Sequence, residues 1–196
     1  MAVTIEAYED WGTAVGSPLA GTTRTLITNA NLKSYSDPAQ HYYLNDVARP
    51  RGFYLEYPNH MCSYTRYIAF KMTVGTKRIR NVKITIPAGF LSDKWRVMYK
   101  LTNTYAEPLG IMNEFSKMSG VMDGSLNTLT SAVTLYPRLS SSGPQNATSR
   151  PVTSAASQTV WTEYLVLQFM AHPSDFDDAD NFGTETISLT LEELET

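Results

Sequence analysis

The sequence of 196 residues contains one cysteine, Cys62, and charged residues make up only 18% of it. A single cysteine excludes a disulfide framework and a zinc site built from several thiolates. No apolar stretch reaches the roughly 18–20 residues that a membrane helix needs, and the longest candidate, residues 164–171, has the length of a strand. Residues 1–7 lack the basic region and apolar run of a signal peptide. We therefore expect no association with a membrane.

Recognisable catalytic motifs are also missing. The sequence has no GxSxG motif and no glycine-rich phosphate loop. Its three histidines, His41, His60 and His172, do not stand in any known catalytic pattern. A nucleophilic site needs Ser or Cys together with a His and an acid, and nothing in the sequence indicates such a set. We expect a protein that is not an enzyme and has no cofactor.

Alternating apolar and polar residues dominate what the sequence does contain, with 42% apolar and 11% aromatic residues. This pattern predicts a single all-β domain over residues 1–196, an antiparallel, jelly-roll-like β-sandwich of about 8–10 strands. The clearest strand covers residues 94–101. Its apolar positions are Trp95, Val97, Tyr99 and Leu101, and they alternate with Lys94, Arg96, Met98 and Lys100. We expect the second set to form a solvated, basic face.

Three segments depart from the strand pattern. Residues 108–119 carry apolar side chains at roughly helical spacing after Pro108, which predicts one short helix. Residues 140–157 are rich in Ser, Pro and Ala and predict a flexible loop or arm. In an assembly, we expect this tract or a chain terminus to lie against another chain. Residues 173–196 form an acidic C-terminal segment.

The charges are distributed unevenly along the chain. Residues 66–100 contain nine Lys or Arg and one acid, whereas residues 163–196 contain nine acids and no Lys or Arg. Either the two segments are neighbours in one sheet, or they pair between subunits. The candidate assembly surface consists of Arg78, Arg80, Lys83, Lys94, Arg96, Lys100, Glu192, Glu193 and Glu195. The acidic isoelectric point of about 5.6 argues against nucleic acid as a partner.

An acidic run near the C-terminus is a more suggestive metal site than His60 and Cys62 with His41, which no further cysteine supports. Its members are Asp175, Asp177, Asp178 and Asp180. Calcium loops place carboxylates at alternate positions with a glycine turn, and Gly183 follows this run. The run has Ala179 where a third alternate acid would stand, and no glutamate follows at the expected offset. A solvated acidic turn is the preferred interpretation.

Tyrosines gather in the first third of the chain and suggest an aromatic surface. The candidates are Tyr42, Tyr43, Tyr57 and Tyr64. Exposed aromatic rings on a sandwich can stack on sugars or bind protein, so a carbohydrate-binding module for a host-surface glycan is the alternative function. Some tyrosines of this region must belong to the core instead, and we expect this of Tyr54 and Tyr67.

Several runs in the middle of the chain resemble small structural proteins of tailed-bacteriophage virions. They are Gly52-Phe53-Tyr54, Tyr57-Pro58, Cys62 to Met72 and Arg80 to Ile84, and the resemblance covers about residues 25–105. It implies a β-sandwich that decorates the capsid as a cement protein or builds the neck, tail or baseplate. It also implies a protein made in the host cytoplasm that binds other virion proteins and copies of itself. The resemblance brings no catalytic residues with it.

Overall fold

The computed structural model describes residues 3–12, 22–27, 61–62, 65–88, 95–106, 123–149, 158–171 and 186–194. Within them the chain is almost entirely extended, and the predicted all-β antiparallel sandwich is confirmed. No helix in this part of the chain is long and apolar enough to span a bilayer. The predicted helix at 108–119 lies outside these residues.

Twelve strands are described, compared with the predicted 8–10, and eight of them have five or more residues. They are β1 (Thr4–Gly12), β2 (Thr22–Leu26), β4 (Arg66–Val74), β5 (Arg78–Ile86), β6 (Trp95–Thr102), β10 (Gln158–Thr162), β11 (Tyr164–Ala171) and β12 (Ser188–Leu194). The short elements are β3 (Met61–Cys62), β7 (Asn127–Thr128), β8 (Val133–Leu135), β9 (Leu139–Ser140) and the 3-10 helix η4 (Pro144–Asn146).

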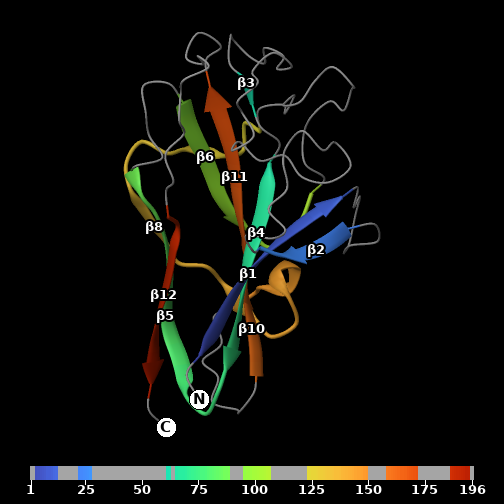
Figure 1. The fold of residues 1–196 in the computed structure, drawn as a ribbon, viewed down its shortest axis with the longest axis vertical. Helices are drawn as coiled ribbons and strands as arrows, with labels where there is room; N and C mark the ends of the chain where they lie inside the picture. Colours follow the sequence, from blue (N-terminus) through green and yellow to red (C-terminus); the bar gives the residue numbers. More distant parts are fainter. Residues whose placement is uncertain are drawn as a thin grey trace.

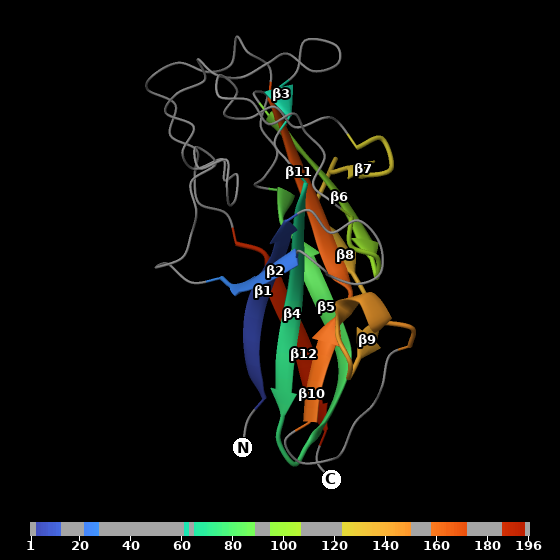
Figure 2. The ribbon, with the colours of Figure 1, turned by 90° about the vertical axis from the view of Figure 1, so that its right-hand side faces the viewer.

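The strands form two antiparallel sheets. The large sheet has the order β2-β1-β4-β11-β6-β7, and β10 continues it beside the lower part of β4 (Figure 1). The small sheet has the order β12-β5-β8. Figure 2 shows β1, β4 and β10 of the large sheet side by side, with β5 and β12 of the small sheet behind them. The described ends of the chain meet at one end of the sandwich, where the Val3 N–H donates to the Glu193 carboxylate at 3.1 Å.

Apolar residues at alternate positions of both sheets fill the space between them. Ile68, Phe70 and Leu165 of the large sheet pack with Ile84 and Ile86 of the small sheet. A second group of inward side chains continues this core toward the chain ends, and it consists of Met72, Val74, Ile79, Val82, Leu139 and Val160. The inward faces of these strands follow the period-2 alternation on which the sandwich prediction rests.

Strands β4 and β5 carry the chain from one sheet to the other. They are joined by the turn at residues 75–77, and each contributes buried residues to the core. Asn81 interrupts β5 with a positive φ of 51°. Two residues of β5, Asn81 and Val82, oppose the single residue Leu191 of β12, so this is a β-bulge on β5. Asn tolerates the left-handed conformation better than most residues, which explains its place here.

The prediction of a solvated face on residues 94–101 was wrong at Met98. Met98 is only 5% exposed, because this face of the large sheet is covered by residues outside the sandwich core. Tyr105 and Leu126 pack there against Met98, Tyr67 and Tyr164. The side chains of this strand do alternate between two faces, but the face that carries Met98 has an apolar cluster of its own. The prediction that Tyr67 is a core residue is confirmed, since it is 3% exposed.

The tract predicted as a loop or arm at 140–157 packs on the domain over its first half, residues 140–149. β9 pairs with β10, and Leu139 forms a bridge with Ser149. Ala147 is fully buried, and η4 follows Gly143, whose φ of 131° favours glycine. The described part of the tract thus packs on its own domain. Residues 150–157 lie outside the described part.

The extended segment at 158–171 is divided into two strands, β10 and β11. Trp161 is opposite Lys71 and Leu165 is opposite Ile68, so three residues on one side face two on β4. The extra residue makes a bulge around Glu163, between β10 and β11. The Phe70 N–H donates at 3.0 Å to the Thr162 hydroxyl within this irregularity. No pattern in the sequence indicated it.

Candidate functional site

The predicted assembly surface is partly formed on the outer face of the small sheet. β5 and β12 pair directly, with Arg80 opposite Glu192 and Arg78 opposite Leu194. Arg80 Nε donates to Glu192 Oε2 at 2.8 Å. Lys77 lies 3.5 Å from Glu193. The basic and acidic segments are therefore neighbours in one sheet, as the intramolecular alternative predicted.

Apart from Lys83, the remaining residues of that predicted surface either lie on the large sheet or are not described. Lys100 stands on the outer face of the large sheet, away from the small sheet. Lys83 does belong with β5 and lies opposite Thr190. Arg96 is in β6, but its side chain is not described. Lys94 and Glu195 lie outside the described residues.

The predicted metal and aromatic sites both lie outside the described residues. These are Asp175, Asp177, Asp178 and Asp180, and Tyr42, Tyr43, Tyr57 and Tyr64. Within the part of the chain that the structure describes, no group of three or more His, Cys, Asp or Glu could hold a metal ion.

A buried carboxylate, Asp10 of β1, is the centre of a polar cluster on the outer face of the large sheet. Arg24 of β2 donates to its two oxygens through Nε and Nη2, both at 2.6 Å. The Tyr164 hydroxyl of β11 donates to the same carboxylate and lies 3.3 Å from Arg24 Nη2. Asp10 is 2% exposed and Tyr164 is fully buried. Burial, together with the adjacent Asp10 charge, raises the pKa of Tyr164 far above its ordinary value.

Partly exposed side chains surround this cluster. The Arg24 guanidinium lies over the Trp161 ring at 4.8 Å from its centroid. Tyr8 contacts Trp161 with a centroid distance of 5.2 Å and an angle of 56° between the ring planes. Lys71 lies 5.7 Å from the Tyr8 centroid and 3.1 Å from Glu6. These rings are tilted against each other, so they do not form the flat platform on which a sugar stacks.

Two further buried carboxylates are also bound by arginines. Glu9 accepts from Arg66 Nε and Nη2 at 2.9 and 3.1 Å, and it is 2% exposed. Glu163, at the bulge, is 4% exposed. It accepts from the N–H, Nε and Nη2 of Arg138 at 2.9, 3.0 and 2.7 Å. The Glu163 N–H donates back to the Arg138 carbonyl at 2.9 Å, so the pair ties residues 138–149 to the large sheet.

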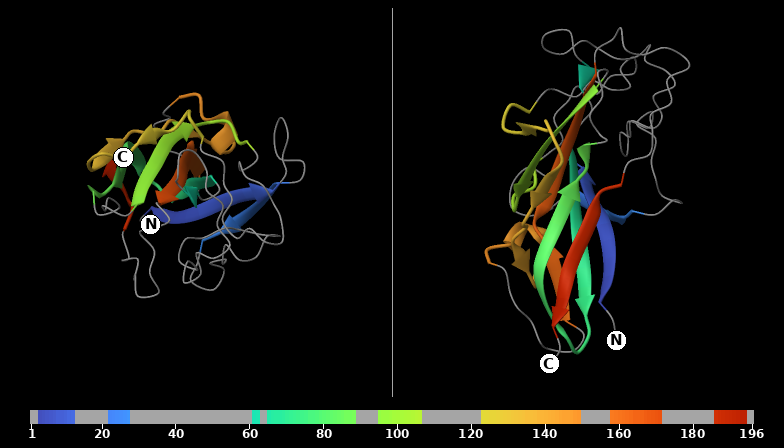
Figure 3. Two further views of the ribbon diagram at one scale, coloured as in Figure 1. Left: turned by 90° about the horizontal axis from the view of Figure 1, so that it is seen from above. Right: turned by 90° about the vertical axis from the view of Figure 1, so that its left-hand side faces the viewer.

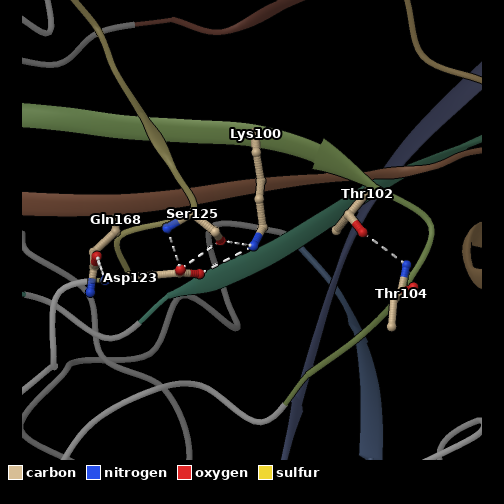
Figure 4. A network of polar contacts seen from close by, with 6 residues as sticks. All are labelled: Lys100, Thr102, Thr104, Asp123, Ser125 and Gln168. Atoms are coloured by element: carbon tan, nitrogen blue, oxygen red, sulfur yellow. Dashed lines mark hydrogen bonds and ion pairs between the residues drawn. The ribbon is translucent and has the colours of Figure 1, made fainter.

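A hydrogen-bond network around Asp123 fastens residues 123–129 to the large sheet (Figure 4). Leu126 of this segment packs on the outer face of that sheet. Lys100 Nζ lies 3.2 Å from Asp123 Oδ2 and 2.6 Å from the Ser125 hydroxyl. The Asp123 N–H donates to Gln168 Oε1 at 2.9 Å. Burial acts to raise the pKa of Asp123, but hydrogen bonds from Ser125 and the Lys100 charge hold it below its ordinary value of 3.8. Asp123 is therefore ionised at neutral pH and fixes the turn.

The contacts of Ser125 in this network can be compared with those of a catalytic serine. Its hydroxyl lies close to both Lys100 Nζ and Asp123 Oδ1, at 2.6 Å from each. A serine–lysine pair needs a neutral lysine as its base. Here Lys100 Nζ also contacts the Asp123 carboxylate at 3.2 Å, and the arrangement suits a structural anchor of the turn.

All three buried carboxylates of the described residues are thus taken up by arginine partners from neighbouring segments. The sequence analysis did not identify Asp10, Glu9 or Glu163. One feature of the sequence could have indicated them: Glu9 and Asp10 are adjacent acids inside an otherwise strand-forming segment. Because neighbouring side chains of a strand point to opposite faces, the two acids must lie on opposite faces of the sheet. Their arginine partners come from distant positions and could not be assigned from spacing.

No protein-family model, curated protein or solved structure matches this chain.

Proposed function

We propose that the protein is a non-enzymatic structural component of a bacteriophage virion, either a capsid decoration or cement protein or part of the neck, tail or baseplate. It assembles through contacts with other virion proteins and with copies of itself. The observation that carries the proposal is the use of every described buried carboxylate in a bond between segments of the fold. Glu9, Asp10 and Glu163 each hold two parts of the chain together through an arginine.

The position of the resembling residues supports the same proposal. Residues 66–72 and 80–84 lie in β4 and β5, the pair of strands that joins the two sheets and fills much of the core. The resemblance to virion proteins therefore concerns the scaffold, which is the part that a building block needs. Titratable groups arranged for catalysis would need at least one acid or base without a permanent partner.

The test is the composition of native particles. Particles of the phage that encodes the chain are purified, and their proteins are quantified by mass spectrometry. We expect this chain in a stoichiometric ratio to other virion proteins, and an electron-microscopy map would then show its position. Its absence from intact particles, with abundance in the infected cell, would contradict the proposal.

The alternative, a carbohydrate-binding module, gains no specific support from the described residues. Tyr67, Tyr105 and Tyr164 are buried, and Tyr8 and Trp161 are tilted against one another. A glycan array probed with the purified protein tests this alternative directly. Specific binding of one glycan class would favour it over a purely structural role.

A further inference from the structure

Among the described strands, β12 is the edge strand of the small sheet next to the start of β1. Among the described strands it pairs only with β5. Its residues alternate between exposed positions at Ser188, Thr190 and Glu192 and half-buried positions at Leu189 and Leu191. The bulge in this pair belongs to β5, so β12 itself keeps its regular spacing. An edge of this kind offers a row of backbone donors and acceptors to another strand.

The neighbouring edge of the large sheet is open beside it. The hydrogen bond between the Val3 N–H and Glu193 places the start of β1 next to β12, on the same side of the sandwich (Figure 3). β2 pairs with β1 only from Tyr8 onward. Ile5 is opposite the fully buried Met72 and therefore faces inward, yet it is 43% exposed. Nothing in the described residues closes the sandwich at this position.

The two edges together specify the form of an occupant. Ile5, Leu189 and Leu191 present apolar surface between the sheets, and β12 adds along the same line an edge that no described strand other than β5 pairs with. A ligand that satisfies both must be an extended strand with apolar residues at alternate positions. β12 itself has this pattern.

We propose that β12 pairs antiparallel with β12 of a second copy, with Thr190 at the two-fold axis. This pairing would join the two small sheets into one continuous sheet across the dimer. The inference rests on the proposed function only in that a virion subunit assembles with copies of itself. It names the surface through which two copies meet.

The register centred on Thr190 is self-complementary. It places Leu189 opposite Leu191 of the second copy on the inward face, next to Ile5. Ser188 is opposite Glu192 of the second copy, and the two Thr190 residues face each other, so no like charges are directly opposite. Glu192 is already neutralised by Arg80 of its own chain at 2.8 Å. A register shifted by one residue, centred on Leu191, would instead place Leu189 against the Glu193 carboxylate.

A cysteine placed at the two-fold axis tests the register. Opposite Cα atoms in an antiparallel pair are about 4.5–5.5 Å apart, within the range that a disulfide spans. In a Cys62→Ser background, Thr190→Cys should give a disulfide-linked dimer under mild oxidation, read on a non-reducing gel. The matched control is Thr134→Cys, an exposed threonine on β8 of the same sheet, which should give no disulfide-linked dimer on the same gel. Labelling of both variants with a maleimide confirms that each thiol is accessible.

A charge at the same position tests the association itself. Thr190→Lys brings two ammonium groups face to face and should abolish the dimer seen by sedimentation equilibrium at high protein concentration. Thr134→Lys adds the same charge on β8 and should leave the dimer intact. A single strand pair buries little area, so the wild-type association is expected to be weak in dilute solution.

The inference is overturned if Thr190→Cys forms no disulfide at any protein concentration while its thiol reacts with maleimide. It is also overturned if Thr134→Cys crosslinks instead. These outcomes are separate from the test of the virion role. A chain that is abundant in particles but does not crosslink at Thr190 retains the proposed function and loses this interface. A chain that crosslinks at Thr190 and is absent from particles has the opposite result.

Discussion

Arg24 and Asp10 are directly opposite each other on β2 and β1, and their side chains form a two-bond ion pair with both contacts at 2.6 Å. The pair is unequal in its surroundings. The Asp10 side chain is 1% exposed, whereas that of Arg24 is 26% exposed and lies over Trp161. The carboxylate is therefore the member that cannot recover water if its partner is lost. This asymmetry decides what a substitution on either side does.

Asp10→Asn should lower the free energy of unfolding by about 2 kcal/mol. It removes the negative charge that accepts hydrogen bonds from Nε and Nη2 of Arg24 and from the Tyr164 hydroxyl. The measurement is urea unfolding followed by intrinsic fluorescence. Glu6→Gln is the matched control, since Glu6 lies on the same face of the same strand and pairs with Lys71. Glu6 is partly exposed, so its loss should cost less than about 1 kcal/mol. Equal effects of the two substitutions would contradict the assigned role of Asp10.

Much of this fold was predictable because the chain alternates apolar and polar residues at period 2. Ile68, Phe70, Ile84 and Ile86 are buried as that pattern requires. Periodicity assigns a residue to a face, but it does not tell whether that face is solvated. Met98 illustrates the difference, because its face is covered by residues 123–129 and not by water.

The polar clusters could not be predicted for a different reason. Asp10 and Tyr164 are 154 positions apart, and Glu163 and Arg138 are 25 apart. Their meeting depends on the order of strands in the sheet and on a one-residue bulge, neither of which leaves a local pattern. The Arg80–Glu192 pair was accessible because each residue belongs to a long segment of one charge sign. Bulk charge asymmetry is visible in a sequence, but a single buried pair is not.

Glu163→Gln should loosen residues 138–149 more than the rest of the domain. The glutamine keeps the size of the side chain but loses the charge that binds the N–H and guanidinium of Arg138. We expect a loss of about 1–2 kcal/mol in the free energy of unfolding. Hydrogen exchange followed by mass spectrometry should show faster exchange in peptides covering 138–149. Unchanged protection there, with faster exchange in β4, would show that the pair does not fasten this tract.

Asp123 makes the stability depend on acid pH. Its pKa is lowered in the fold, so its contribution is fully present above the ordinary value of 3.8 and is lost as the pH falls through the lower folded value. Asp123→Asn should therefore be less stable than the wild type at neutral pH. The difference should shrink as the pH falls below 3.8. Chemical unfolding at a series of acidic pH values measures it, and a constant difference would contradict the assignment.

Tyr67 gives the opposite behaviour at alkaline pH. Burial, and then the nearby Asp123 carboxylate, raise its pKa from 10.0 to about 12, which means that the fold favours the neutral phenol. The stabilisation is full below pH 10 and is lost as the pH rises toward 12. The ultraviolet absorbance of phenolate should therefore show a late phase from Tyr67, near pH 12 and above the ordinary tyrosine value of 10.0. Tyr67→Phe should remove one late-titrating group.

The Asp123 contribution to this delay can be separated from burial. Asp123→Asn removes the negative charge but leaves Tyr67 packed between Tyr105 and Tyr164, at centroid distances of 4.8 and 5.6 Å. The late phase should then move to lower pH without merging with that of the exposed tyrosines, because burial is the larger cause of the shift. A late phase that does not move would show that Asp123 exerts no electrostatic effect on Tyr67. A complete merger would show that the 123–129 segment has left the sheet and exposed the cluster beneath it.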